Sequence, residues 1–373
     1  MTNANFDMTV AGETATLLGF FQKRSLMSGY LRHVLDANLF DPHQVTKPDW
    51  YDSLSKNLSD VKAKGQQWFD VTSVSMTDLA QNYVNFANAF DGQMGKLLPL
   101  MTDLIAGTGD ADTIVGGIVT IFDDWISQAR GEAKRAAASE AAFKSYLTGL
   151  SAAITALTQG AASVNTAIAV DKQQVINITA DIATLQAQLQ TDIKAAIAAN
   201  SGTLAALIVL IIGIVIVVGS GGTAAIVGAV IAGVGLAGTL VGTIITSIDI
   251  VNDQNAIVAK MGELSDENQQ VVVLNGIALT VNGLVDTYKD AGFDMSDLVD
   301  TWSNLVTNLQ QVRDLIIAER TDAQGLKAVL CDIKDFQTTL DALRLYATDL
   351  QAAALSVDAL PVKTLTPLAA LAA

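Results

Sequence analysis

Apolar residues recur along most of this chain at alternating steps of three and four, which is the spacing of one face of a helix. One row contains Ile154, Leu157, Ala161, Val164, Ile168, Val175, Ile178, Ile182, Leu185, Leu189 and Ile193. A second row contains Leu298, Trp302, Leu305, Leu309, Val312, Ile316, Leu326, Leu330, Ile333, Leu340, Leu343, Ala347 and Leu350. Glu319 and Gln337 interrupt this second row. Such rows predict helices that bury their apolar faces against one another, as in a bundle.

The placement of proline allows these helices to be long. None of the five prolines lies between residues 100 and 360, and a proline inside a helix costs about 3 kcal/mol or more. The pattern predicts helices over residues 12–38, 49–105, 113–199, 249–290 and 297–355. At 1.5 Å per residue the third would extend about 130 Å. We therefore expect an all-α fold, an elongated bundle of about five long helices, in which Asp110 or Asp112 caps the start of the third helix.

The segment from residue 195 to residue 248 breaks this pattern because it contains no charged residue. Its first arm, Thr203 to Val218, has twelve Leu, Ile or Val residues among sixteen, and its second arm, Thr223 to Ile248, has eleven among twenty-six. On a membrane-insertion scale the first arm alone gains about 4 to 7 kcal/mol. The two arms predict a transmembrane helical hairpin. We call residues 195–248 the head, and residues 1–194 and 249–373 the tail bundle.

Three sets of head residues have expected roles. The membrane-inserting set is Leu204, Leu207, Ile208, Leu210, Ile211, Ile212, Ile214, Val215, Ile216, Val217, Val218, Ile226, Val227, Val230, Ile231, Val234, Leu236, Leu240, Val241, Ile244 and Ile245. The turn between the arms is Gly219, Ser220, Gly221 and Gly222. Small residues let helices approach closely inside a membrane, and the glycines assigned to this packing are Gly228, Gly233, Gly235, Gly238 and Gly242.

The head lacks the features of a permanent membrane anchor. It has no aromatic residue, and the nearest basic residues are Lys194 and Lys260, so interfacial and charge signals for a fixed orientation are missing. An uncharged turn crosses a bilayer without the cost of desolvating an ion. We therefore expect the head to be masked in water and to insert at a membrane. The β-branched run from Leu207 to Val218 suits a strand as well as a helix, so a helical pair and a β-tongue are both compatible with the soluble head.

Composition narrows the function further. The net charge of −16 argues against nucleic acid, which requires a basic surface. A single cysteine, Cys331, and two histidines, His33 and His43, give no metal-ligand spacing and no catalytic set. We expect Cys331 to be buried beside Leu330, and we expect no enzyme activity, cofactor or metal.

One sequence in the head has the form of a nucleotide-binding motif. Residues 233–238 read G-x-G-x-x-G, and Asp253 follows its first glycine by twenty residues. A dinucleotide site would also require alternating strands and helices on both sides, whereas the flanks here have long helical patterns. We attribute these glycines to helix packing.

A bundle of long helices interrupted once by an uncharged apolar hairpin resembles the cytolysin A (ClyA) family of α-helical pore-forming toxins. The two arms are similar in length to the two-transmembrane-helix (B-like) component of tripartite toxins such as haemolysin BL, non-haemolytic enterotoxin and their Gram-negative counterparts. The resemblance implies a haemolysin or cytolysin component that inserts its head into a target-cell bilayer and oligomerises with itself in the pore. It also implies partner components, one of them amphipathic to line the lumen.

Two other classes remain open at the level of sequence. A secretion-system translocator also combines coiled coils with an apolar hairpin, and a resident membrane or structural coiled-coil protein would share the same pattern. The N-terminal residues have no basic region followed by an apolar core. We expect secretion without a classical signal peptide, followed by insertion into the target membrane.

Overall fold

The computed structural model describes residues 8–36, 49, 51–167, 173–185, 187 and 295–358. It also describes shorter stretches at residues 215–218, 224–227, 233–234, 240–241, 256–257, 259–260, 263–264, 268 and 272. The chain divides into two compact units. Unit 1 contains residues 1–20, 75–142 and 294–352, and unit 2 contains residues 21–74, 143–293 and 353–373.

Long helices make up most of the described residues. They are α1 (Val10–Asp36), α2 (Tyr51–Gln67), α3 (Ser73–Ala106), α4 (Ala111–Ala167), α8 (Ser296–Ala318) and α9 (Ala323–Asp358), with a π-helical turn η2 (Trp68–Thr72) joining α2 to α3. At 1.5 Å per residue, the 57 residues of α4 extend about 85 Å. The predicted all-α bundle of long helices is confirmed.

The helix starts predicted at residues 12, 49, 113 and 297 lie within two residues of observed ones, whereas the start of the helix predicted over residues 249–290 and most of that helix lie outside the described residues. The helix predicted over residues 49–105 is the run α2–η2–α3, and Pro99 lies inside α3. Gly107 and Gly109 have positive φ in the turn before α4, a conformation that glycine adopts without strain. Asp110 caps α4, since its Oδ2 accepts a hydrogen bond from the Thr113 backbone N–H at 3.1 Å and another from the Thr113 hydroxyl. The helix predicted over residues 113–199 is observed as α4 and as helical residues 173–185.

The prediction of one helix from residue 297 to residue 355 is wrong. The chain turns at residues 319–322 and makes two helices, α8 and α9. The Glu319 N–H closes α8 on the Leu315 carbonyl at 2.8 Å, and the Asp322 side chain accepts the Gln324 N–H at 2.9 Å at the start of α9. This turn contains neither proline nor glycine, so the sequence offered only a short polar run as its signal.

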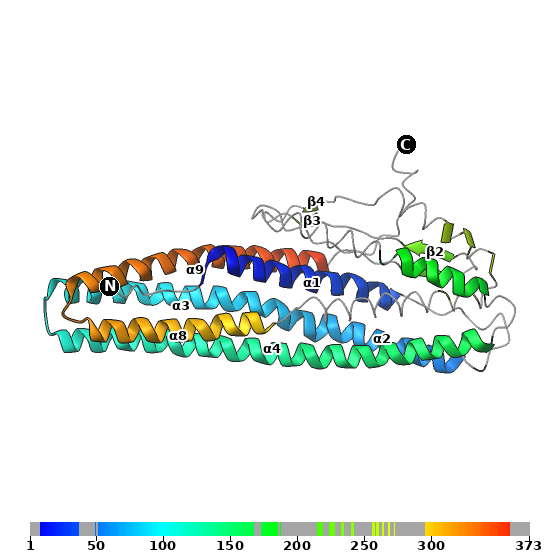
Figure 1. The fold of residues 1–373 in the computed structure, drawn as a ribbon, viewed down its shortest axis with the longest axis horizontal. Coiled ribbons are helices and arrows are strands. Elements are labelled where there is room, and N and C mark those ends of the chain that lie inside the picture. Colours follow the sequence, from blue (N-terminus) through cyan, green and yellow to red (C-terminus); the bar gives the residue numbers. More distant parts are fainter. Residues whose placement is uncertain are drawn as a thin grey trace. The chain divides into compact units, whose positions relative to one another are not determined.

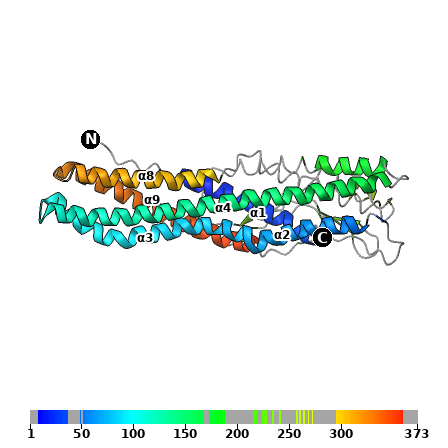
Figure 2. The same cartoon turned by 90° about the horizontal axis from the view of Figure 1, so that it is seen from below.

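Aromatic side chains form the core of unit 1, where α3, α4, α8 and α9 run side by side (Figure 1; Figure 2). Trp302 of α8 contacts Tyr83 and Phe86 of α3, with ring centroids 5.0 and 5.5 Å apart. Phe90 of α3 stacks on Trp125 of α4 at 4.1 Å. Such ring pairs contribute about 0.5–1.5 kcal/mol beyond the area they bury. These contacts fix how the helices of unit 1 pack.

Ion pairs on the surface of unit 1 show the relative direction of two of its helices. Arg313 of α8 pairs with Asp123 of α4 at 2.6 Å, and Arg320 pairs with Asp112 at 2.9 Å. Residue numbers rise along α8 as they fall along α4, so the two helices are antiparallel.

The predicted apolar rows are confirmed where burial is described, which leaves out Ala161, Val164, Ile168, Leu189 and Ile193. The buried members are Ile154, Leu157, Val175, Ile178, Ile182, Leu185, Leu298, Trp302, Leu305, Leu309, Val312, Ile316, Leu326, Ile333, Leu340, Leu343, Ala347 and Leu350. Leu330 is half-buried, and the expectation that Cys331 is buried is wrong, because this cysteine is exposed. The buried face of α9 passes instead through Val329, Ile333 and Phe336, and Cys331 falls outside those steps of four and three.

Unit 2 is organised around Trp68 in the π-turn. Its indole Nε1 donates to Ser28 Oγ of α1 at 2.9 Å, and its ring lies 5.4 Å from that of Tyr146 in α4. The Arg24 Nε of α1 donates to the Ser73 carbonyl at 3.0 Å. Burial raises the pKa of the Tyr146 hydroxyl, which donates to the Lys64 carbonyl at 3.2 Å. The π-turn is therefore held by α1 and α4 at its buried side.

Candidate functional site: the head and its base

Two pairs of short strands are described within the head. Strand β1 (Val215–Val218) pairs antiparallel with β2 (Ala224–Val227), with Val215 opposite Val227 and Val218 opposite Ala224. Strand β3 (Gly233–Val234) pairs antiparallel with β4 (Leu240–Val241). Valine and isoleucine fill β1, and such β-branched side chains favour extended backbone. The described head backbone thus follows the β-tongue alternative rather than the helical pair.

The expected head residues divide into two groups. Those within strands are Val215, Ile216, Val217, Val218, Ile226, Val227, Gly233, Val234, Leu240 and Val241. The other members of the inserting set, the turn from Gly219 to Gly222, and the packing glycines 228, 235, 238 and 242 lie outside the described residues. The membrane role of both groups remains a prediction.

Two antiparallel segments, described around residues 174–185 and 257–264, flank the head in the sequence, and we call them its base. In this base the Lys260 ammonium lies 2.6 Å from Asp181 Oδ2, and Gln174 Nε2 donates to Glu263 Oε2 at 3.2 Å. The apolar side of the base consists of the buried residues Val175, Ile178, Ile182, Leu185, Ile257 and Leu264. Where the structure describes them, the two flanking segments are therefore adjacent and oppositely directed.

The predicted apolar row includes four residues of this base, from Val175 to Leu185, but neither Ile257 and Leu264 nor the polar contacts were predicted. Asp181 and Lys260 are 79 residues apart in the chain, and each resembles any other charged residue on a helix surface. Only the structure, in which the two side chains are 2.6 Å apart, identifies them as a pair.

The remaining candidates for chemistry gain no support. Gly233 and Val234 belong to an antiparallel strand pair, whereas a dinucleotide fold uses parallel strands joined by helices. His33 lies in α1 and His43 lies outside the described residues. Among the residues that the structure describes, no three His, Cys, Asp or Glu side chains gather closely enough to hold a metal ion.

None of the helices within the described part of the chain is both long enough and hydrophobic enough to span a membrane.

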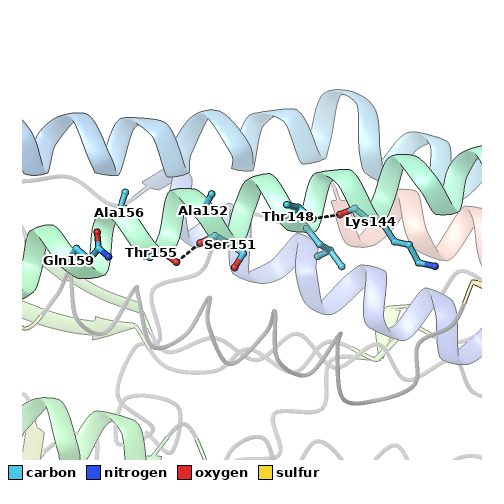
Figure 3. A pocket seen from close by; sticks show the side chains of 8 residues that line it. Lys144, Thr148, Ser151, Ala152, Thr155, Ala156 and Gln159 are labelled. Carbon is cyan, nitrogen blue, oxygen red and sulfur yellow. Dashed lines mark hydrogen bonds between the residues drawn. The ribbon is translucent and has the colours of Figure 1, made fainter.

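A cavity of about 680 Å³ lies along one side of α4 (Figure 3). Its lining consists of Lys144, Leu147, Thr148, Ser151, Ala152, Thr155, Ala156 and Gln159. Two of its hydroxyls donate back to their own helix, Thr148 to the Lys144 carbonyl at 3.0 Å and Thr155 to the Ser151 carbonyl at 2.8 Å. Among the described residues, this lining contains no carboxylate, imidazole or thiol. We call this feature the α4 groove.

No protein-family model matches the sequence, and no curated protein matches it either. Solved structures do match. The soluble SmhA component of the tripartite α-pore-forming toxin Smh from Serratia marcescens has 14% identity and a TM-score of 0.69, covering 97% of this chain and 99% of its own. The HblL1 toxin component of Bacillus cereus has 14% identity and a TM-score of 0.64, covering 95% and 98%.

A third similar structure is soluble AhlB of the tripartite α-pore-forming toxin AHL from Aeromonas hydrophila. It has 14% identity and a TM-score of 0.65, covering 98% of this chain and 99% of its own. The likeness extends over nearly the full length of both chains in each comparison. The fold implied by the sequence resemblance is thereby confirmed: this chain has the fold of soluble components of tripartite α-pore-forming toxins.

Proposed function

We propose that this chain is one component of a multi-protein α-pore-forming toxin and that its head inserts into a target-cell membrane. One observation carries the proposal: a chain with the fold of these toxin components has, between the two segments of an antiparallel base, 54 residues without charge. An uncharged apolar segment of this length has a favourable free energy of transfer into lipid. A tail bundle of aromatic and ionic contacts stays in water while the head changes its environment.

The arms of the head favour a role beside partner components. Neither arm has a polar stripe along its length, so a ring made only of these arms would present Leu, Ile and Val to the lumen. Hydrophobic constrictions resist wetting. A partner with an amphipathic head supplies the polar lumen, while this chain faces lipid and contacts further copies of itself in the ring.

The remaining features are consistent with this role. The chain acts without a cofactor or metal and carries out no covalent chemistry. It is secreted as a masked, water-soluble form, because a large exposed apolar surface drives aggregation. The target-cell bilayer is its site of action, and the membrane-inserting residues are those of the head.

Leakage from vesicles tests the proposal. Phosphatidylcholine vesicles loaded with a self-quenched dye are exposed to this chain alone, to the products of neighbouring genes alone, and to the mixture. We expect slow leakage with the single chain and fast leakage with the mixture. Equal leakage with and without this chain would show that it is not a component of the pore.

A further inference from the structure

We propose that the exposed face of α9 is a contact surface for a second copy of this chain, and that the two copies of α9 pack antiparallel about a twofold axis at Thr338. All residues of this surface belong to unit 1 and lie in the described part of the chain. This contact is independent of the proposed function, because it joins two copies of the protein in water. Spacing, charge and side-chain size along this face all fit a reversed copy of the same helix.

Helix α9 has a buried side and an exposed side. Leu326, Leu340 and Leu343 are buried. On the opposite side, residues at steps of three and four form one row, and each is exposed except Ala342, which is half-buried. We call this row the α9 stripe: Gln324, Lys327, Cys331, Lys334, Thr338, Ala342, Leu345, Asp349 and Ala352. Leu345 is 67% exposed, more than any other large apolar residue in the described part of the chain.

The α9 stripe has the same spacing when it is counted from either end. Starting from Thr338, its members lie 4, 7, 11 and 14 residues away in each direction. In a twofold contact, residue i of one copy meets residue j of the other, and j meets i. A row with this spacing can therefore face a reversed copy of itself, with Thr338 opposite the partner's Thr338.

The charges on the two halves of the stripe have opposite signs. Lys327 and Lys334 lie before Thr338, and Asp349 lies after it. Asp341 lies beside the stripe, seven residues from Lys334 and so on the same edge of the helix. The antiparallel pairing places Lys327 opposite the partner's Asp349 and Lys334 beside the partner's Asp341. A parallel pairing would place like charges opposite one another, so the charges select the antiparallel direction.

The side chains of the stripe are also complementary in size. The pairing places each Leu345 opposite the partner's Cys331, and the small residues of the stripe leave room for a leucine between them. Asp335, on the other edge of the helix, lies opposite the partner's Ala342 and meets no carboxylate there. The stripe is one helix wide, so we expect it to bury less than the about 800 Å² per partner of a standard interface and to form dimers at micromolar concentration.

Disulfide formation tests the pairing in the full-length protein. Residues 331 and 345 are 14 residues apart in one helix, which is about 21 Å and too far for a disulfide within one chain. In Leu345→Cys, the native Cys331 and the new thiol face each other twice across the contact. Mild oxidation should therefore give a covalent dimer at least about tenfold faster than in the parent protein. Ser303→Cys, which adds a thiol at an exposed position of α8, is the control for random collision.

A second thiol variant tests the twofold axis and keeps Leu345. In a Cys331→Ser background, the thiol of Thr338→Cys meets its own copy, so mild oxidation should again give a covalent dimer. Dimers that form no faster than those of Ser303→Cys in both variants would exclude the pairing. In Leu345→Cys, links between two positions 345 or between two positions 331, found by mass spectrometry in place of links between 331 and 345, would exclude it as well.

Reversal of charge tests the contact without an engineered thiol. Asp349→Lys places two pairs of lysines across the contact, so it should raise the dissociation constant of the dimer, measured by sedimentation, at least about tenfold. Addition of Lys327→Glu to this variant should restore the dissociation constant to within about threefold of the parent value. Asp300→Lys makes the same change of charge at an exposed position of α8 and should have no effect.

Two results of sedimentation would overturn the proposal. The first is a parent protein that is monomeric at every concentration measured. The second is a dimer whose dissociation constant is the same in Asp349→Lys as in the parent, because such a dimer is held together by another surface, such as the head.

Discussion

The aromatic core of unit 1 and the head have opposite compositions. The core joins Trp302, Tyr83 and Phe86 by ring contacts of fixed geometry, and ion pairs such as Arg313–Asp123 fix the helices around it. The head contains no aromatic and no charged residue. Large rings and ion pairs specify one arrangement, whereas small and β-branched residues are compatible with strands in water and with helices in lipid. The side chains of the core are therefore specific for one arrangement, whereas those of the head are compatible with two.

The largest expected effect comes from placing charge in the head. Each Asp at the centre of an inserting helix costs about 2.5–3.5 kcal/mol, and the whole first arm gains about 4 to 7 kcal/mol. The double variant Leu210→Asp with Val215→Asp should therefore remain folded and lose all membrane permeabilisation, even with partner components present. Vesicle leakage measures the loss, and circular dichroism verifies the fold.

A matched pair of substitutions on the tail separates the effect of position from that of charge. Ser303→Asp and Gln311→Asp add two carboxylates at exposed positions of α8 and should leave leakage unchanged. Full activity of the head variant would show that the head is not the inserting element.

The next effect concerns the core. Trp302→Ala removes a fully buried ring that contacts Tyr83 and Phe86, and truncation of this kind lowers the free energy of unfolding by about 3–5 kcal/mol. Urea unfolding measures the change. Leu345→Ala, at an exposed position of α9, should change stability by less than about 0.5 kcal/mol. Equal effects of the two variants would mean that the aromatic core does not determine the stability of the bundle.

A smaller effect depends on pH. The Glu13 carboxylate accepts a hydrogen bond from the Tyr83 hydroxyl at 2.8 Å and from Thr301 at 3.3 Å. Burial raises the pKa of Glu13 above its ordinary value, outweighing the hydrogen bonds, which lower it. The stabilising contribution of the protonated group is therefore complete below the ordinary pKa and is lost as the pH rises through the raised pKa.

Glu13→Gln removes this dependence, because an amide stays neutral. We expect the melting temperature of the parent to fall, relative to that of Glu13→Gln, as the pH rises from about 4 to 8. Parallel melting curves of the two proteins across this range would show that the carboxyl titrates as it does in the unfolded chain.

The smallest effect is expected at the base of the head. Lys260 and Asp181 are half-exposed, and exposed ion pairs contribute about 0.2–1 kcal/mol. A double-mutant cycle with Lys260→Ala and Asp181→Ala should return a coupling energy in that range that weakens in high salt. No coupling would mean that the apolar side of the base alone holds its two segments together.

Apolar periodicity was sufficient to predict the helices and most of their buried faces, because each helix repeats its signal over many turns. Residues 319–322 were missed because this turn uses a polar side-chain cap in place of glycine or proline. The ion pair between Asp181 and Lys260 could not be predicted either, because nothing in the sequence distinguishes these two residues from other charged residues on helix surfaces. The conformation of the head could not be fixed from sequence because Val215 to Val218 satisfy both a strand in water and a helix in lipid.

The π-turn η2 contains one more residue than the α-helical turn that could replace it in the helical run of residues 51–106. Buried positions advance by alternating fours and threes up to Trp68, and then by four twice, through Thr72 to Met76. A deletion elsewhere in this run would rotate every following residue by 100° away from the core. A deletion at the exposed Val71 would instead return the π-turn to a regular α-turn and leave both flanking faces in place. Single-residue differences in length are therefore tolerated best at η2.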